Sequence, residues 1–261
     1  MIPVYAILRK TQKELHTYLY KQLSEEYYYT DITSADNYLL AKGDIPILLV
    51  AHLDTVYPEI TRSHMQIYYD QKHMVMWSPD GIGADDRAGV IIILRILQAG
   101  YRPHVLFTHD EEFGGGGAFD ASMDPQLLKW DIRYMIQLDR SGYDDCVFYS
   151  CNNLEFTHYI ESFGFSEEIG SFSDISVLMP YTNIAGVNLS VGYEDEHIET
   201  EHWHLGWANE TYSKVIAMLS APPEQVFKYI KGPGGYYWDS WINGYTSNEF
   251  NEYSHTPATK L

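Results

Sequence analysis

One helix with almost no polar face constrains the fold more than any other part of this sequence. Residues 85–100 (DDRAGVIIILRILQAG) contain a run from Val90 to Leu97 that is aliphatic except for Arg95, and Gly100 ends it. A helix that is apolar on nearly all sides is a buried helix. Its first turn nevertheless contains two adjacent aspartates, Asp85 and Asp86. The fold therefore has to bring carboxylates to the edge of its hydrophobic core.

The position of Asp85 allows two interpretations. Carboxylates at a helix N-terminus are stabilised by the unpaired N–H groups and by the helix dipole, so Asp85 can serve as a simple N-cap. The alternative is a metal ligand. Several other short patterns in the chain, each of which ends an apolar run, contain the residue types of a two-metal hydrolase, and they favour the second interpretation.

Short apolar runs of the kind found in buried parallel strands alternate with helical patterns along the chain. The runs are at 45–51 (IPILLVA), 104–108 (HVLFT), 134–138 (YMIQL) and 184–191 (IAGVNLSV), with paired strands at 27–42 and a hairpin at 66–77. We predict further helices at 11–26, 153–163, 171–179 and 207–219. This order predicts an α/β fold, with a single domain in which helices sandwich a mixed, mostly parallel sheet. We place this catalytic domain at residues 1–221, and an aromatic- and glycine-rich C-terminal tail at 222–261.

Charge and composition exclude some classes of partner. The 261 residues contain 17 Lys and Arg against 36 Asp and Glu, which gives a net charge of −19. Nucleic acids and anionic membranes attract basic surfaces, so we expect neither as a partner. No run approaches the roughly 20 apolar residues of a membrane span. The start of the sequence lacks the pattern of a signal peptide, and with only two cysteines a cytoplasmic location is expected.

The run at 45–51 ends in His52-Leu53-Asp54. Ligands of open α/β sheets bind at the carboxyl ends of the strands, and alternation turns His52 and Asp54 to the same side. A histidine that binds a metal through one nitrogen usually donates a hydrogen bond to a carboxylate from the other, and Asp54 is placed to accept it. A purely structural His–Asp pair is the alternative.

Two further strands end in acidic residues. The run at 104–108 leads into His109-Asp110-Glu111-Glu112, and the run at 134–138 leads into Asp139-Arg140. An isolated buried carboxylate is costly. The four titratable residues 109–112 therefore either project into solvent or include at least one that binds a cation.

The strand ends and the helix start together supply two imidazoles and three carboxylates: His52, Asp85, Glu112, Asp139 and His197. Imidazole and carboxylate suit zinc, and cobalt or manganese are possible by the same logic. Five ligands divide most naturally between two ions if one carboxylate bridges them. Glu111, next to a ligand but needed by neither ion, is then a candidate for the general base. His202 and His204 are alternatives to His197 as the last histidine.

Five short motifs together resemble those of the co-catalytic zinc exopeptidases, in order and in rough spacing. The motifs are VAHLDTV (50–56), GIGADDRAGV (81–90), THDEEFGGGGA (108–118), IQLDR (136–140) and GYEDEHIETE (192–201). That family includes bacterial leucyl aminopeptidases, tripeptidase-type enzymes, glutamate carboxypeptidases and acyl-amino-acid deacylases. The resemblance covers about residues 45–219.

The resemblance implies a role for each matching residue. It implies two zinc ions per chain: His52 and Asp139 on one, Glu112 and His197 on the other, and Asp85 between them. It further implies that the Asp85–Asp86 peptide is cis, that Asp54 orients His52, and that Glu111 is the general base. Residues 140–196 are too few for the lid domain that many relatives insert, so the chain is similar to the single-domain aminopeptidases.

The expected activity is that of a dizinc aminopeptidase acting on peptides or amino-acid amides, in which a metal-bridged water attacks with help from Glu111. A carboxypeptidase or N-acyl-amino-acid deacylase is the first alternative, because Arg140 or Arg87 could bind a substrate carboxylate. A catalytically silent scaffold that binds through its aromatic tail is the second. The sequence leaves the oligomeric state open, so assembly of several copies is also possible.

Overall fold

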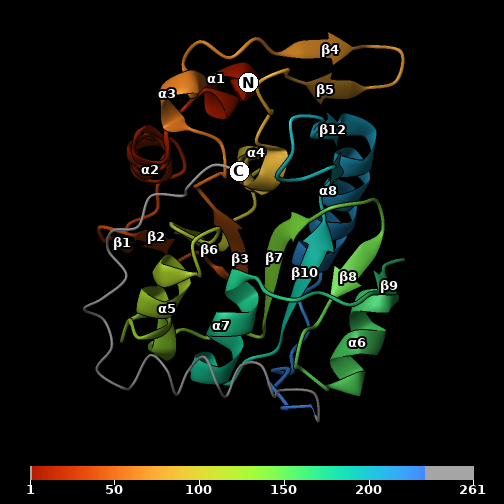
Figure 1. The fold of residues 1–261 in the computed structure, drawn as a ribbon. Coiled ribbons are helices and arrows are strands. Elements are labelled where there is room, and N and C mark those ends of the chain that lie inside the picture. Colours follow the sequence, from red (N-terminus) through yellow and green to blue (C-terminus); the bar gives the residue numbers. More distant parts are fainter. Residues whose placement is uncertain (1, 233–261) are drawn as a thin grey trace, which may run out of the picture.

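The computed structural model describes residues 2–232, and an eight-stranded sheet lies at its centre (Figure 1). The strand order is β1-β2-β6-β3-β7-β10-β8-β9. The strands are β1 (Ile32–Ser34), β2 (Tyr38–Ala41), β3 (Ile45–His52), β6 (Pro103–Thr108), β7 (Tyr134–Arg140), β8 (Asp145–Val147), β9 (Ser166–Glu167) and β10 (Gly186–Ser190). The four central strands, β6, β3, β7 and β10, run parallel. The predicted mixed, mostly parallel sheet is confirmed.

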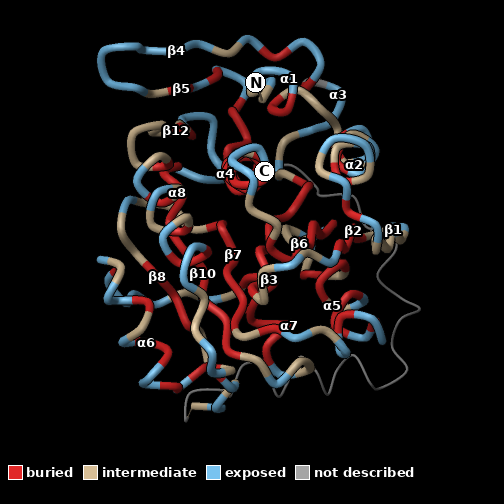
Figure 2. The backbone as a smooth tube through the Cα atoms, turned by 180° about the vertical axis from the view of Figure 1, so that it is seen from behind, coloured by how far each residue is buried: buried red, intermediate tan, exposed pale blue. Residues whose placement is uncertain are grey.

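The central strands are buried on both faces, which explains their continuous apolar sequences. Every residue from Ile47 to Ala51 in β3 is fully inaccessible to solvent. Pro46 cannot donate a hydrogen bond to a neighbouring strand, and it lies where the β3–β6 register shifts, between Ile45 and Leu48. Figure 2 shows these strands as the buried centre of the molecule.

Helices cover both faces of the sheet, as predicted (Figure 1). The chain leaves β3 through α4 (Ala84–Gln98) to reach β6, and leaves β6 through α5 (Gly116–Ser122) to reach β7 on the other side of β3. Right-handed crossovers in opposite directions place the two helices on opposite faces. Helix α8 (Leu205–Ser220) packs beside α4, and α7 (Asp174–Thr182) packs beside α5.

The remaining helical segments lie around the sheet. They are α1 (Val4–Leu8), α2 (Gln12–Lys21) with its π-helical continuation η1 (Gln22–Glu26), α3 (Glu59–Arg62), the 3-10 turn η2 (Leu127–Lys129) and α6 (Leu154–Glu161). Helix α2 begins with a capping box, in which Thr11 accepts from the N–H of Glu14 and Glu14 accepts from the N–H of Thr11. Helix α1 has no counterpart among the predicted elements, because five residues are too few to show a helical period.

Helix α4 is buried from Ala84 to Leu97 except for half-exposed Arg95, as its sequence predicts. Its first turn is irregular, since Asp85 and Asp86 have non-helical backbone angles and the peptide bond between them is cis. The cis bond implied by the family resemblance is therefore present.

A second sheet of four antiparallel strands lies beside the first, in the order β11-β12-β5-β4. Its strands are β4 (Tyr68–Asp70), β5 (Val75–Trp77), β11 (Tyr193–Glu194) and β12 (His202–His204). The β4–β5 hairpin is predicted from the sequence, whereas β11 and β12 are too short to be recognised there. The loop from 195 to 201 joins β11 to β12 and contains His197.

No second domain is inserted between Asp139 and His197. That part of the chain forms β8, α6, β9, α7 and β10, within or against the large sheet, and then β11 of the small sheet. No helix in the described part of the chain is long and apolar enough to cross a membrane.

Only the first part of the predicted tail belongs to the described structure. Phe227 is buried against Phe156 and Tyr134, and Lys228 forms an isolated β-bridge with Ile184. Residues 222–232 therefore pack against the sheet domain. Residues 233–261 lie outside the described residues, and the boundary at 221 stays a prediction.

Candidate metal centre

The side chains singled out in the sequence meet at the carboxyl edge of the central parallel strands. His52 is the last residue of β3, Asp139 lies near the end of β7, and Glu112 follows the end of β6. Asp85 comes from the first turn of α4, and His197 from the loop between β11 and β12. This edge is where open α/β sheets bind ligands.

His52, Asp85 and Asp139 form a buried triad that could hold a metal ion. The Nε2 atom of His52 lies 2.9 Å from Oδ1 of Asp85 and 3.4 Å from Oδ1 of Asp139. Ligands on a tetrahedral zinc ion, with metal–ligand bonds of about 2.0–2.1 Å, are about 3.3 Å apart. The spacing of the three atoms suits one ion between them.

Asp85, Glu112 and His197 form a second triad of the same kind. The Nε2 atom of His197 lies 3.1 Å from Oδ2 of Asp85 and 3.0 Å from Oε2 of Glu112. Asp85 belongs to both triads and turns a different oxygen to each histidine. One carboxylate thus lies between two His–carboxylate pairs, which is the arrangement expected of a bridging ligand.

Asp54 lies next to the first triad and also contacts the loop after β6. Its Oδ1 atom is 3.2 Å from Nδ1 of His52, and its two oxygens accept hydrogen bonds from the backbone N–H groups of Glu111 and Glu112. The contact leaves Nε2 of His52 directed at Asp85 and Asp139. Asp54 therefore fixes both the ring of His52 and the position of the Glu111–Glu112 segment.

Asp139 is held by hydrogen bonds from three strands, two to its carboxylate and one to its backbone. Gln137 of β7 donates to Oδ2 at 3.0 Å, and Tyr193 of β11 donates to Oδ1 at 3.2 Å. Asn188 of β10 accepts from the backbone N–H of Asp139 and donates to its carbonyl. The sequence analysis missed these three residues. Of the three, only Gln137 could have been identified from the sequence, because alternation along β7 places its side chain on the same side as that of Asp139.

Glu201 holds the irregular start of α4. Its side chain is fully buried and accepts hydrogen bonds from the backbone N–H groups of Gly83 and Asp85, at 2.8 and 2.9 Å. Gly83 has a positive φ of 63°, a conformation that glycine adopts without cost. Glu201 is the last residue of the fifth sequence motif, so the sequence marked the position but not its role.

Asp86 and Gly89 bring α4 close to the strand ends. Asp86 is fully buried and accepts from the backbone N–H groups of His52 and Gly89, at 3.1 and 2.9 Å. A Cβ atom on Gly89 would lie 2.1 Å from the carbonyl oxygen of Leu138. The second aspartate of the pair therefore has a structural role, with no part in either triad.

The electrostatics of this cluster favour a cation. Burial, with the nearby charge of Asp85, raises the pKa of Asp139 to about 8 and that of Glu112 to about 7. A hydrogen bond with Asp85 raises the pKa of His197 to about 9. Oε1 of Glu112 is buried and has no hydrogen-bond partner among the described residues. A divalent cation would supply the missing partner and keep the carboxylates ionised, so the donor set fits a metal centre.

Glu111 belongs to neither triad. It lines the same cavity as Asp85, Glu112 and Asp139, and burial raises its pKa well above the usual range. A carboxyl group with a raised pKa in a cleft is suited to accept and then release a proton near neutral pH.

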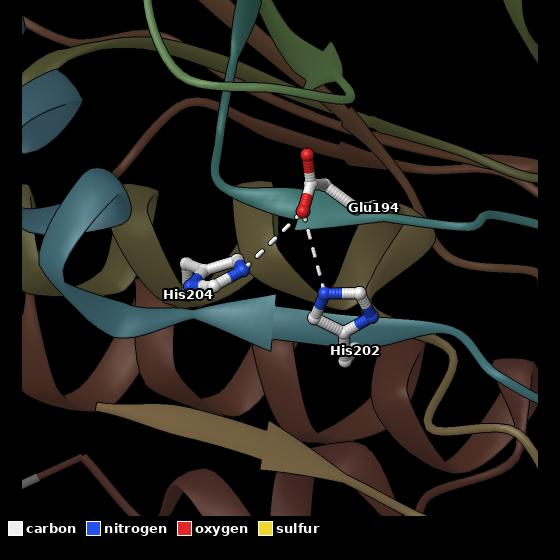
Figure 3. Close-up of side chains that lie close together, drawn as sticks. All are labelled: Glu194, His202 and His204. Carbon is white, nitrogen blue, oxygen red and sulfur yellow. Dashed lines mark ion pairs between the residues drawn. The ribbon is translucent and has the colours of Figure 1, made fainter. Parts of the chain in front are cut away.

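His202 and His204 lie away from both triads. They are on β12, and their Nε2 atoms face the carboxylate of Glu194 (Figure 3). Of the three histidines considered from the sequence, His197 is therefore the one that lies beside Asp85 and Glu112.

The two arginines considered for a carboxylate-binding role differ in their surroundings. Arg87 is buried, and its guanidinium donates hydrogen bonds to the backbone carbonyls of Leu53 and Lys10. Arg140, unlike Arg87, lines the cavity beside Asp139, while the Nε atoms of both lack a hydrogen-bond partner among the described residues. Of the two, Arg140 is the one able to meet a substrate there.

Solved structures share this architecture. Aminopeptidase PepT from Bacillus cereus matches at a TM-score of 0.64 and 15% sequence identity, over 83% of this chain and 96% of that one. A tripeptidase from Staphylococcus aureus matches at a TM-score of 0.65 and 15% identity, over 83% and 95%. The chain has the fold of these peptidases. By sequence, no family model and no curated protein matches it.

The same fold also supports another reaction. Glutaminyl cyclase from Porphyromonas gingivalis matches at a TM-score of 0.56 and 14% identity, over 83% of this chain and 96% of that one. The fold alone therefore does not decide the chemistry, which has to be argued from the side chains of the site.

Proposed function

We propose that the protein is a two-metal aminopeptidase that removes residues from the N-termini of peptides. The observation that supports this most is the position of Asp85, whose two oxygens face two separate His–carboxylate pairs. His52 and Asp139 would hold one ion, and Glu112 and His197 the other, with Asp85 shared. Zinc suits these donors best, and cobalt or manganese fit the same set.

Glu111 is the proposed general base and acid. Two divalent ions in this centre would supply Lewis acidity for a scissile carbonyl and lower the pKa of a water molecule. The carboxylate of Glu111 takes a proton from the attacking water and delivers it to the amine of the leaving group. Its buried position, without a place in either triad, leaves it free for this transfer.

The charge of the cavity supports action at the N-terminus. Outside the two triads, the charged side chains that line it are Glu111, Glu196 and Arg140, so carboxylates predominate among them. Such a surface attracts the cationic α-amine of a peptide and repels its α-carboxylate. Glu196, which accepts a hydrogen bond from Ser141 at 3.2 Å, is not needed by either triad and can bind the amine.

The test is cleavage of one short peptide in three forms: free at both ends, blocked at the amine, and blocked at the carboxyl. Each form is assayed with zinc, with and without a chelator. We expect loss of cleavage on amine blocking and on chelation, and retention on carboxyl blocking. Cleavage that survives amine blocking but not carboxyl blocking would contradict the aminopeptidase assignment. Cleavage that survives the chelator would contradict the metal.

Arg140 keeps one alternative open, a carboxypeptidase or N-acyl-amino-acid deacylase that uses the same centre. Its guanidinium lines the cavity, and its Nε has no hydrogen-bond partner among the described residues. A substrate carboxylate would need such a partner. The amine-blocked peptide and the Arg140 variant described below separate the two activities.

A further inference from the structure

A second group of metal-binding side chains lies in the small sheet, with no residue in common with the candidate metal centre. It consists of Glu194, His202 and His204 (Figure 3). Oε2 of Glu194 is 3.3 Å from Nε2 of His202 and 3.3 Å from Nε2 of His204. Both distances match the separation of ligands around a tetrahedral zinc ion, about 3.3 Å, and all three potential ligand atoms lie within 4.8 Å of one another.

The register of the strands produces this convergence. Glu194 on β11 is directly opposite His202 on β12. His204 lies two residues further along β12, so alternation turns it to the same face as His202. Trp203, between them, points the other way and is buried. The spacing His-X-His on one strand, opposite a glutamate, thus gathers three ligands on a single face of the hairpin.

Each histidine ring is held in an orientation that suits a ligand. Nδ1 of His202 is 3.0 Å from the backbone carbonyl of Thr200, and a carbonyl can only accept, so Nδ1 has the proton. The neutral ring then turns the lone pair of Nε2 to Glu194. The ring of His204 stacks on Trp207, with centroids 4.0 Å apart. A hydrogen bond from the far nitrogen of the ring to a carbonyl is the usual support of a metal-binding histidine.

A proton-based explanation of the cluster is less favourable. For Nε2 of His202 to donate to Glu194 as well, the ring would have to be an imidazolium. A histidine that binds a metal through Nε2 remains a neutral imidazole. His204 can donate to Glu194 from Nε2 as a neutral ring, so His202 is the ring that a proton-based explanation requires to be charged. A divalent cation satisfies both lone pairs and the carboxylate at once.

We propose that Glu194, His202 and His204 form a third metal site, for zinc or a similar divalent transition ion. Two imidazoles, one carboxylate and a water complete a tetrahedral shell. The side chains are 44%, 26% and 22% exposed, so an ion can enter from solvent. Nickel and copper would bind the same donors, in the usual order of affinity for divalent ions.

The position of this site suggests what it does. Glu194 and His202 are the residues on either side of loop 195–201, so an ion between them closes the base of the loop. The loop contains His197 and Glu201, both of which contact Asp85. An ion at the base would hold the loop in the geometry that the candidate metal centre needs. This consequence, unlike the binding site itself, rests on the proposed function.

The test is the zinc content of the full chain after removal of metals and dialysis against buffered zinc. We expect the double variant His202→Gln, His204→Gln to bind one zinc ion fewer than the unaltered protein. His73→Gln is the matched control, because His73 is an exposed histidine in the turn between β4 and β5 of the same small sheet, and among the described residues its ring pairs with Asp70. The control should bind as much zinc as the unaltered protein.

The loss of this ion does not depend on whether the other centre binds metal. If the proposed function fails because His52, Asp139 and their neighbours bind no metal, both totals fall together and the difference stays at one. Equal zinc content in the unaltered protein and the folded double variant would overturn the proposal. If the double variant does not fold, Glu194→Gln serves instead, and we expect the affinity for one zinc ion to fall roughly tenfold or more. An unchanged zinc affinity in the Glu194→Gln variant would also overturn the proposed third metal site.

The effect on the loop has a separate readout. With zinc saturating, backbone amides of residues 195–201 should exchange hydrogen faster in the His202→Gln, His204→Gln variant than in the unaltered protein. Equal exchange in the two proteins, together with the loss of one zinc ion, would support the metal site and contradict its role in holding the loop.

Discussion

The carboxylate of Asp54 accepts a hydrogen bond from the backbone N–H of Glu112 at 3.1 Å. The other oxygen lies 3.2 Å from Nδ1 of His52 and accepts from the N–H of Glu111 at 3.2 Å. His52 and Glu112 belong to different triads, so one side chain at the end of β3 aligns both of them. The backbone of Glu111, the candidate base, is held in position by the same carboxylate.

Asp54→Asn should therefore weaken both halves of the centre. The amide places an NH₂ group where an oxygen now accepts from a backbone N–H or faces Nδ1 of His52. We expect zinc affinity to fall roughly 10–100-fold, with a matching loss of kcat/KM at limiting zinc. Asp110→Asn is the control, because Asp110 is exposed, belongs to neither triad, and has a side chain that accepts a hydrogen bond from Gln12 at 3.4 Å. Zinc affinity equal to that of the control would refute the positioning role.

Glu111→Gln and Glu112→Gln, at adjacent positions, should behave differently. Glu111 has no place in either triad, so its variant should keep its metal content and lose kcat by roughly 10²–10⁴-fold, the usual contribution of a general base. Glu112 lies 3.0 Å from His197, and its variant should lose metal. Metal analysis beside single-turnover cleavage measures both. A Glu111→Gln protein that cleaves at the normal rate would exclude the proposed chemistry.

Arg140→Ala tests whether the cavity binds a substrate carboxylate. For an aminopeptidase we expect KM for a tripeptide to change little, because the guanidinium would face no charged group of the substrate. For the carboxypeptidase or deacylase alternative, KM should rise steeply, since a charge-assisted hydrogen bond is lost. The measurement is KM for the same peptide with a free and an amidated C-terminus. A large increase confined to the free carboxylate would favour the alternative.

The positions of several candidate site residues follow from local sequence. His52 and Asp54 belong to a single strand end, and their common direction follows from alternation alone. Asp85 lies at the start of a helix whose burial is evident from its composition. The strands β3, β6, β7 and β10 were expected from continuous apolar runs, and each occurs within a few residues of its predicted position.

The parts that depend on packing between distant elements could not be predicted. Tyr193 and Asn188 reach Asp139 only because β10 lies next to β7 and β11 follows it, an order that apolar runs do not specify. The choice between His197 and the pair on β12 depended on a hairpin with strands of two and three residues. Such short strands have no measurable period, so their register and the direction of His202 were beyond sequence reasoning.

Gly89 and Gly206 provide a matched pair for the packing of the helices. A methyl group at Gly89 would lie 2.1 Å from the carbonyl oxygen of Leu138, and neither backbone can yield easily. Gly89→Ala should lower the free energy of unfolding by about 1–3 kcal/mol or more. At Gly206, in α8, the nearest atom is 4.0 Å away, so Gly206→Ala should raise it by about 0.4–1 kcal/mol. Urea denaturation measures both. A loss of stability at Gly206 similar to that at Gly89 would contradict the packing argument.

The stability of the fold should depend on pH through His104, far from the metal centre. Nδ1 of His104 accepts from the N–H of Gly43 at 3.0 Å, and Nε2 lies 3.2 Å from the carbonyl of Asp131, so the buried ring is neutral. Burial lowers the pKa of this imidazole below its usual value. Below about pH 6.5 the unfolded chain takes up a proton that the folded protein does not, and the free energy of unfolding falls. Above that pH the contribution of His104 is constant.

His104→Gln removes this titration while keeping a polar side chain. Every other ionisable group is common to the two proteins, so the difference in their stability isolates His104. The unaltered protein should be more stable than the variant by a larger margin at pH 7 than at pH 5, because burial lowers the pKa of His104 in the folded protein alone. Urea denaturation at the two pH values measures it. The same difference at both would show that the folded protein protonates His104 as readily as the unfolded chain does.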